Sequence, residues 1–119
     1  METLIHHIQG QDIAEVLSDA ILIRTAQDGL DIMMELAFSG VSKIILHQKN
    51  ISPEFFNLKS GLAGEILQKF VNYRMQVAIV GDFKNIQSES LRAFIIESNR
   101  GKQNFFVEDL ETAKRCLVV

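Results

Sequence analysis

Helical and strand-like segments alternate along this 119-residue chain after residue 25, and this alternation constrains the fold more than any other feature. Apolar residues recur at helical spacing in the segments 25–40, 61–72, 88–101 and 107–117. Short apolar runs typical of buried strands lie between them, at 42–48, 75–82 and 104–107. Strands joined by crossover helices form a parallel sheet. The sequence therefore predicts an α/β fold with a mostly parallel sheet and about four helices.

The N-terminal part of the chain predicts an antiparallel hairpin at one edge of this sheet. The runs "TLIHHI" (3–8) and "DIAEVL" (12–17) are separated by a short turn that contains Gly10. The apolar run 20–24 is either a further strand or the segment that leads into the first helix. Because no linker, repeat or low-complexity segment interrupts the chain, residues 1–119 are expected to form a single domain.

Local signals mark several of the expected helix ends. Thr25 and Asp28 have the spacing of a capping box. Ser52 and Pro53 are typical of the N-cap and first position of a short helical turn. Asn99 or Gly101 is expected to end the third helix in a left-handed conformation.

Composition excludes several classes of function. The net charge is −3 and no basic stripe is present, so neither nucleic acid nor an anionic membrane is expected as a partner. A single cysteine, Cys116, and the lack of a signal-peptide pattern predict a cytoplasmic protein.

His6 and His7 are neighbours in a strand and point to opposite faces, so no metal is expected. No glycine-rich nucleotide loop or paired carboxylates occur, and neither a cofactor nor catalytic residues are assigned.

The stretch Lys59-Ser60-Gly61, directly before the second long helix, is the first candidate site. Unpaired N–H groups and partial positive charge at a helix N-terminus favour a phosphate or another anion, and Lys59 strengthens this preference. The alternative is structural, with Ser60 as the N-cap and Gly61 relaxing the turn.

A second candidate site lies where two predicted parallel strands end. His47 and Asp82 occupy these carboxyl ends, at which open α/β sheets collect their ligands. Ser60 begins the helix after the His47 strand, so the three side chains are expected to surround one shallow site. The alternative is that Asp82 caps the following turn and His47 has a structural role.

The amino-acid sequence resembles that of a known bacterial family. The run from Lys43 to Phe83 and the later "LRAFIIESNRG" are similar to the family catalogued as domain of unknown function 4180, which has no established activity. More distantly, the layout resembles STAS domains, the fold of anti-sigma-factor antagonists, in which a loop serine can be phosphorylated by a partner kinase. By position that serine is Ser60, although Lys59 stands where the STAS pattern has Asp. This resemblance implies a STAS-like fold.

Together these features predict a non-enzymatic regulatory module that binds a protein partner and is switched by phosphorylation of Ser60. The expected partner contacts are Glu65, Gln68, Lys69, Asn72 and Arg100. One alternative is a domain that binds a small anionic ligand, or acts as an enzyme, at His47, Ser60 and Asp82. Another is a structural homodimer that associates through Ile32 and Leu36, expected to be exposed on the first helix.

Overall fold

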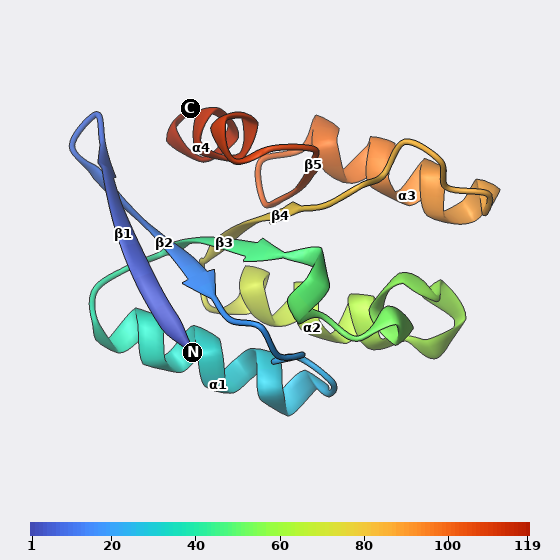
Figure 1. The fold of residues 1–119 in the computed structure, drawn as a ribbon, viewed down its shortest axis with the longest axis horizontal. Helices are drawn as coiled ribbons and strands as arrows, with labels where there is room; N and C mark the ends of the chain where they lie inside the picture. Colours follow the sequence, from blue (N-terminus) through green and yellow to red (C-terminus); the bar gives the residue numbers. More distant parts are fainter.

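A computed structural model describes all residues, 1–119, and confirms the predicted alternation (Figure 1). The five strands are β1 (Glu2–Ile8), β2 (Gln11–Leu17), β3 (Lys43–His47), β4 (Gln76–Val80) and β5 (Asn104–Val107). The four α-helices are α1 (Ala26–Phe38), α2 (Leu62–Asn72), α3 (Glu89–Arg100) and α4 (Leu110–Val118). Three short 3₁₀ helices, η1 (Gln48–Asn50), η2 (Pro53–Phe56) and η3 (Leu58–Ser60), connect β3 to α2.

The strands form one sheet in the order β1-β2-β3-β4-β5. β1 and β2 are antiparallel, as predicted, and the pairs from β2 to β5 are all parallel. The hairpin turns through Gln9 and Gly10, whose φ angles of 52° and 74° match the type I′ turn that suits a two-residue loop. Residues 20–24 form no named strand and contribute only an isolated bridge from Ile23 to Ile51, so this run leads into α1.

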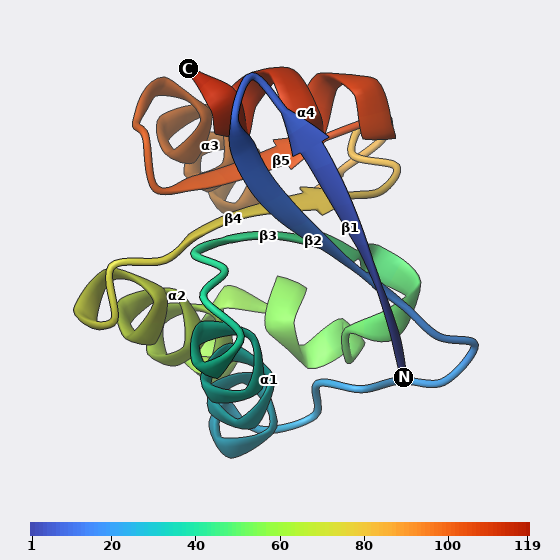
Figure 2. The same cartoon turned by 90° about the vertical axis from the view of Figure 1, so that its left-hand side faces the viewer.

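Helices cover both faces of the sheet, and each face has its own core. The larger cluster of buried residues joins α1, α2 and α3 to one face. The smaller cluster joins α4 to the opposite face through Ile13, Ile45, Ala78 and Phe105. Figure 2 shows α1 and α2 on one side of the sheet and α4 on the other. Three successive right-handed crossovers place their helices on one face, and only α4, which has no strand after it, is free to pack on the other.

The predicted helix starts are confirmed, and α3 ends at Gly101 as predicted, but the left-handed conformation predicted for this end is wrong. Thr25 and Asp28 form the capping box of α1. Gly101 has a φ of −87° and an extended backbone, so no left-handed residue ends α3. The Asn99 side chain instead donates to the Phe106 carbonyl at 3.0 Å and accepts from the Phe106 N–H at 2.8 Å. Asn99 therefore ties α3 to β5 and does not cap the helix.

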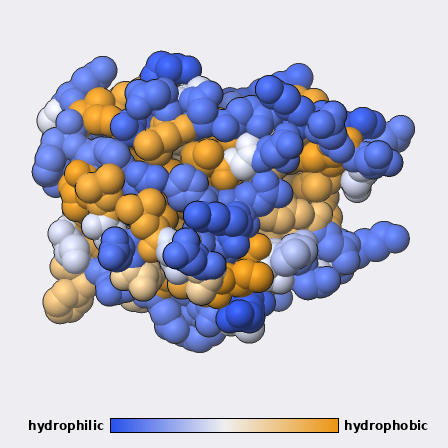
Figure 3. All heavy atoms as spheres, viewed as in Figure 1, coloured by the Kyte–Doolittle hydropathy of each residue, from blue (hydrophilic) through white to orange (hydrophobic).

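The expectation that Ile32 and Leu36 are exposed on α1 is wrong, because both lie in the larger core. The helix is rotated so that its exposed apolar side chains are Met34 and Phe38, the latter 97% exposed. Figure 3 shows hydrophobic residues on the visible face over the region of the hairpin and α1. A homodimer through Ile32 and Leu36 would require the core to open.

Gly81, at the end of β4, lies against the side chain of Gln48. A Cβ at this position would approach the Gln48 Cβ to 2.7 Å, which is closer than atoms in proteins pack. Gln48 Oε1 also accepts a hydrogen bond from the Asp82 N–H at 3.0 Å, so the side chain cannot move without breaking that bond. We expect Gly81→Ala to lower the free energy of unfolding by about 1–3 kcal/mol, measured by urea denaturation. Gly64→Ala, in open space within a helix, is the control and should stabilise slightly.

Candidate ligand site at the carboxyl ends of β2 and β3

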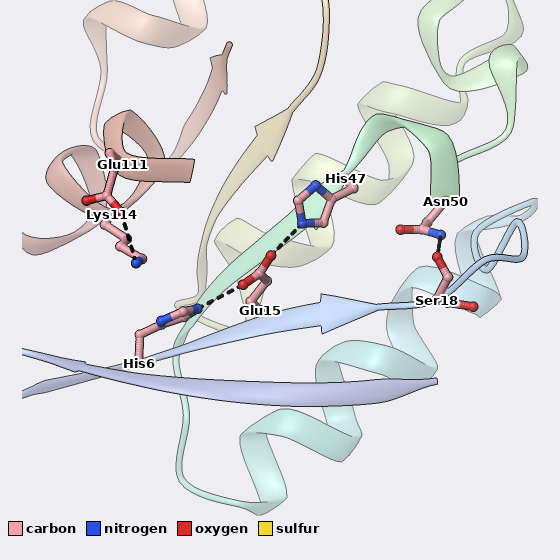
Figure 4. Close-up of polar contacts among 7 residues, drawn as sticks. All are labelled: His6, Glu15, Ser18, His47, Asn50, Glu111 and Lys114. Atoms are coloured by element: carbon pink, nitrogen blue, oxygen red, sulfur yellow. Dashed lines mark hydrogen bonds and ion pairs between the residues drawn. The ribbon is translucent and has the colours of Figure 1, made fainter. Parts of the chain in front are cut away.

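A buried carboxylate, Glu15 on β2, lies between two histidines from the neighbouring strands (Figure 4). His6 Nε2 on β1 is 2.8 Å from Glu15 Oε1, and His47 Nε2 at the end of β3 is 2.6 Å from Oε2. The side chain of Glu15 is 6% exposed, and those of His6 and His47 are 16% and 23% exposed. One carboxylate therefore links three adjacent strands.

The strand register explains why these three side chains meet. His6 lies opposite Ile13, two residues before Glu15, and Glu15 lies opposite Ile45, two residues before His47. Residues two apart on a strand share a face, and diagonal neighbours on adjacent strands are within reach of long side chains. All three side chains consequently lie on the α4 face of the sheet, beyond the part of it that α4 covers.

The electrostatics of the site follow from burial and the two histidines. Burial alone would raise the pKa of Glu15, but hydrogen bonds from His6 and His47 and their positive charge outweigh it, and the pKa is lowered. Glu15 is therefore ionised at neutral pH, and each histidine must donate its Nε2–H to it. The Nδ1 atom of each ring is left for another partner. Lys114 on α4 takes no part, because it bonds Glu111 at 3.3 Å.

An open cavity of about 560 Å³ lies beside the Glu15–His47 pair. Its lining residues are Met1, Glu2, Glu15, Leu17, Ser18, Asp19, His47 and Lys49. α4 does not cover this corner, because its C-terminal end is anchored at the opposite ends of the strands. There Lys43 and Gln11 bond the carbonyls of Leu117 and Val118.

Asn50 shapes the wall of this cavity. Its side chain is buried, and its Nδ2 donates to the carbonyls of Ser18 and Ala20, each at 2.8 Å. These two bonds fix the segment that follows β2, which carries the lining residues Ser18 and Asp19. Figure 4 shows the bond from Asn50 to Ser18 beside the Glu15–His47 pair.

The lowered pKa of Glu15 predicts a specific dependence of stability on pH. Its folded pKa lies below the unfolded value of about 4.3, so the stabilisation is complete above that value and is lost as the pH falls through the folded pKa. We expect the free energy of unfolding of the wild type to fall more steeply below about pH 4 than that of Glu15→Gln. Urea denaturation from pH 7 to pH 2.5 measures this difference, and parallel curves for the two proteins would contradict it.

The structure places only His47, of the three residues predicted for the sheet-edge site, at this cavity. Asp82 is not among the lining residues; its Oδ1 accepts from the Lys84 N–H at 3.3 Å and its own N–H donates to Gln48. These bonds match the alternative in which Asp82 caps the turn after β4. Ser60 is also absent from the lining.

Ser60 lies at the end of η3, on the surface. Its hydroxyl donates to the Glu54 carbonyl at 2.7 Å and accepts from the Leu62 N–H at 3.2 Å, in the first turn of α2. Gly61, with a φ of 79°, provides the left-handed turn between the two helices. Gly61, not Ser60, is therefore the N-cap of α2, although the Ser60 hydroxyl still accepts from the first N–H of the helix. Phosphorylation of Ser60, or anion binding there with Lys59, stays a prediction.

The predicted partner contacts fall on two separated surfaces. Glu65, Gln68 and Asn72 are exposed on α2, where Gln68 and Asn72 bond each other at 2.9 Å, and Lys69 is half-buried. Arg100 is exposed at the end of α3 and pairs with Glu97 at 3.5 Å. No contact among these residues joins the two surfaces, and their role in partner binding stays a prediction.

Two further features concern metals and membranes. No group of three or more His, Cys, Asp and Glu side chains is placed to hold a metal ion. No helix has both the length and the apolar character to cross a bilayer.

The fold and site define an α/β domain with a mixed five-stranded sheet and a buried Glu–His pair beside an open cavity. The chain belongs to the family described as Domain of unknown function (DUF4180), which it matches over residues 8–117. No curated protein and no solved structure matches it. The family resemblance seen in the sequence is thus confirmed, and the STAS likeness stays a prediction.

Proposed function

We propose that this domain is a non-enzymatic regulatory module that binds a small polar ligand in the cavity beside Glu15 and His47. The observation that carries the proposal is the buried carboxylate held by two histidines at the wall of an open cavity. This cavity lies at the carboxyl ends of parallel strands, where α/β sheets bind ligands.

The energetic cost of the Glu15 network supports a role beyond stability. Removing a carboxylate from water costs several kcal/mol, and well-packed apolar side chains in such places are often as stabilising as the ion pair. Ile13 and Ile45, on the same face, show the kind of residue that packs there. We therefore infer that the role of the Glu15 carboxylate is to position the His47 ring.

The charges of the lining favour a ligand that donates hydrogen bonds. Glu2, Glu15 and Asp19 supply carboxylates, whereas Lys49 is the one lysine. With its Nε2–H donated to Glu15, the His47 ring leaves Nδ1 free on the cavity side of the pair. This favours small amines or polyols over the anions expected from the sequence.

Catalysis is not part of the proposal, because the Ser18 hydroxyl accepts from the Ala20 N–H and has no contact with His47 that would activate it.

A thermal-shift screen tests this proposal with small amines, polyols, carboxylates and inorganic phosphate as probes. We expect amines or polyols to raise the melting temperature of the wild type and to have no effect on His47→Gln. His7→Gln is the matched control, because His7 bonds Asp12 elsewhere on the hairpin and should leave the response unchanged. Stabilisation by phosphate or carboxylates alone, or an equal response in His47→Gln, would contradict the proposal.

Ser60 supports a second candidate function, a phosphorylation switch for a protein partner in the cytoplasm. Its hydroxyl is at the surface beside Lys59, and phosphate there would add negative charge near the N-terminus of α2. The layout likeness to STAS domains is the reason for proposing a kinase. Affinity capture with wild-type, Ser60→Ala and Ser60→Asp baits tests it, and equal retention of the same partner by all three would contradict it.

A further inference from the structure

We propose that β1 is an interaction edge that pairs with β1 of a second copy of this chain, extending the sheet across a two-fold axis. β1 is the last strand of the sheet at this end and has a neighbour, β2, on one side only. The proposal does not rest on ligand binding in the cavity, although Glu2 of β1 also lines that cavity.

The hairpin register identifies the backbone groups that are free to pair. Ile8 and Gln11 flank a two-residue loop, so they form a hydrogen-bonded pair, and the same holds for every second residue along β1. The N–H and C=O groups of the residues between them, Thr3, Ile5 and His7, therefore point away from β2. These are the groups that an added strand would bind.

The side chains of β1 are self-complementary in one antiparallel register. A two-fold axis normal to the sheet and passing at Leu4 places Leu4 opposite Leu4, Thr3 opposite Ile5, and Glu2 opposite His6. Leu4 is 48% exposed and would become covered at the centre of the pair. The Glu2 carboxylate would face the His6 ring of the second copy, whose Nε2 already bonds Glu15, and it accepts from Nδ1 when that ring carries a proton on both nitrogens. Each contact occurs twice because of the symmetry.

Nothing along β1 blocks such pairing. Natural edge strands are protected by proline, lysine, a bulge or a covering element, and the segment ETLIHHI contains no proline and no lysine. Its seven residues pair with β2 one to one, without a bulge. The opposite edge differs, because β5 has four residues and α3 packs along it. Figure 3 shows hydrophobic side chains on the face that carries β1.

Sedimentation velocity over roughly 1–500 µM, a range that covers weak protein association, tests the dimer. We expect a concentration-dependent shift from monomer to dimer in the wild type. Leu4→Lys should raise the dimer Kd more than about tenfold, because it opposes like charges at the axis. Thr3→Pro should do the same, since it removes an outward N–H and leaves the ladder to β2 intact. Ile96→Lys, on the exposed face of α3, is the control and should dimerise like the wild type.

Disulfide cross-linking tests the register. Residues opposite each other in a non-hydrogen-bonded antiparallel pair have Cα atoms about 4.5 Å apart, which a disulfide can bridge. Leu4→Cys should therefore form a covalent dimer on mild oxidation, whereas Ile96→Cys should not. Cys116 is half-buried and burial raises the pKa of its thiol, which slows its reaction in both variants.

A wild type that stays monomeric over the whole range, with no cross-link in Leu4→Cys, would overturn the proposal. So would a dimer that survives both Leu4→Lys and Thr3→Pro. We expect the circular dichroism spectra of both variants to match that of the wild type. Loss of the dimer would then result from the altered β1 edge and not from unfolding.

Discussion

Glu15→Ala is expected to lower the free energy of unfolding at pH 7 by about 2–4 kcal/mol. The substitution leaves the Nε2 atoms of His6 and His47 without their acceptor in a largely buried place and opens a void between three strands. Urea denaturation followed by circular dichroism measures the change.

Asp12→Ala is the matched control for this prediction. Asp12 also bonds a histidine, His7, at 2.5 Å, but this pair is on the surface, with side chains 54% and 75% exposed. Exposed pairs contribute little, so the change should stay below about 0.5 kcal/mol. Equal losses of stability in Glu15→Ala and Asp12→Ala would contradict a special role for the buried network.

The triple variant His6→Leu, Glu15→Leu and His47→Leu should recover much of the free energy of unfolding lost in Glu15→Ala, but it should not bind ligand.

Phe106→Ala is expected to cost about 3–5 kcal/mol, the other large effect. The ring is 3% exposed and is surrounded by Phe55, Phe83 and Phe94, at centroid distances of 6.4, 5.6 and 5.8 Å. It joins β5 and α3 to the larger core, so its removal leaves a cavity that several elements would have to close. Denaturation midpoints provide the measurement. Phe38→Ala, at a side chain 97% exposed, is the control and should change stability by less than about 0.5 kcal/mol.

The order of strands and helices could be predicted because local sequence patterns specify each of these elements. The capping box at Thr25, the turn at Gly10 and the apolar β-branched runs of β3 and β4 each specify a local conformation. The rotation of α1 was harder to predict, since apolar residues occur around much of this helix. Burial of Ile32 and Leu36 is decided by contacts with α2 and the sheet, which no local pattern contains.

The centre of the candidate site was missed because its residues are far apart in the chain. Glu15 lies 9 residues from His6 and 32 from His47, and it looked like the polar position of an ordinary strand. One signal was available. Glu15 shares a face with Ile13 and Leu17, so an alternating pattern already placed a carboxylate on an apolar face.

His47 was predicted correctly as a residue at a carboxyl strand end, but its partners were not. The order of residues in the sequence groups His47 with Ser60 and Asp82, which follow it in the chain. The structure instead pairs it with β2, the neighbouring strand that precedes it. The three short helices between His47 and Leu62 give Ser60 its own local partners, and Gln48 occupies the space next to Asp82.

Two-dimensional NMR titration of the wild type with small amines and polyols tests the central claim, that Glu15 and His47 form a ligand site, most directly. We expect saturable chemical-shift changes at the amides of Glu15, Ser18 and His47 and at the His47 ring, and we expect these changes to be lost in His47→Gln. Saturable shifts confined to the Ser60 loop, or shifts at the cavity that persist unchanged in His47→Gln, would contradict it.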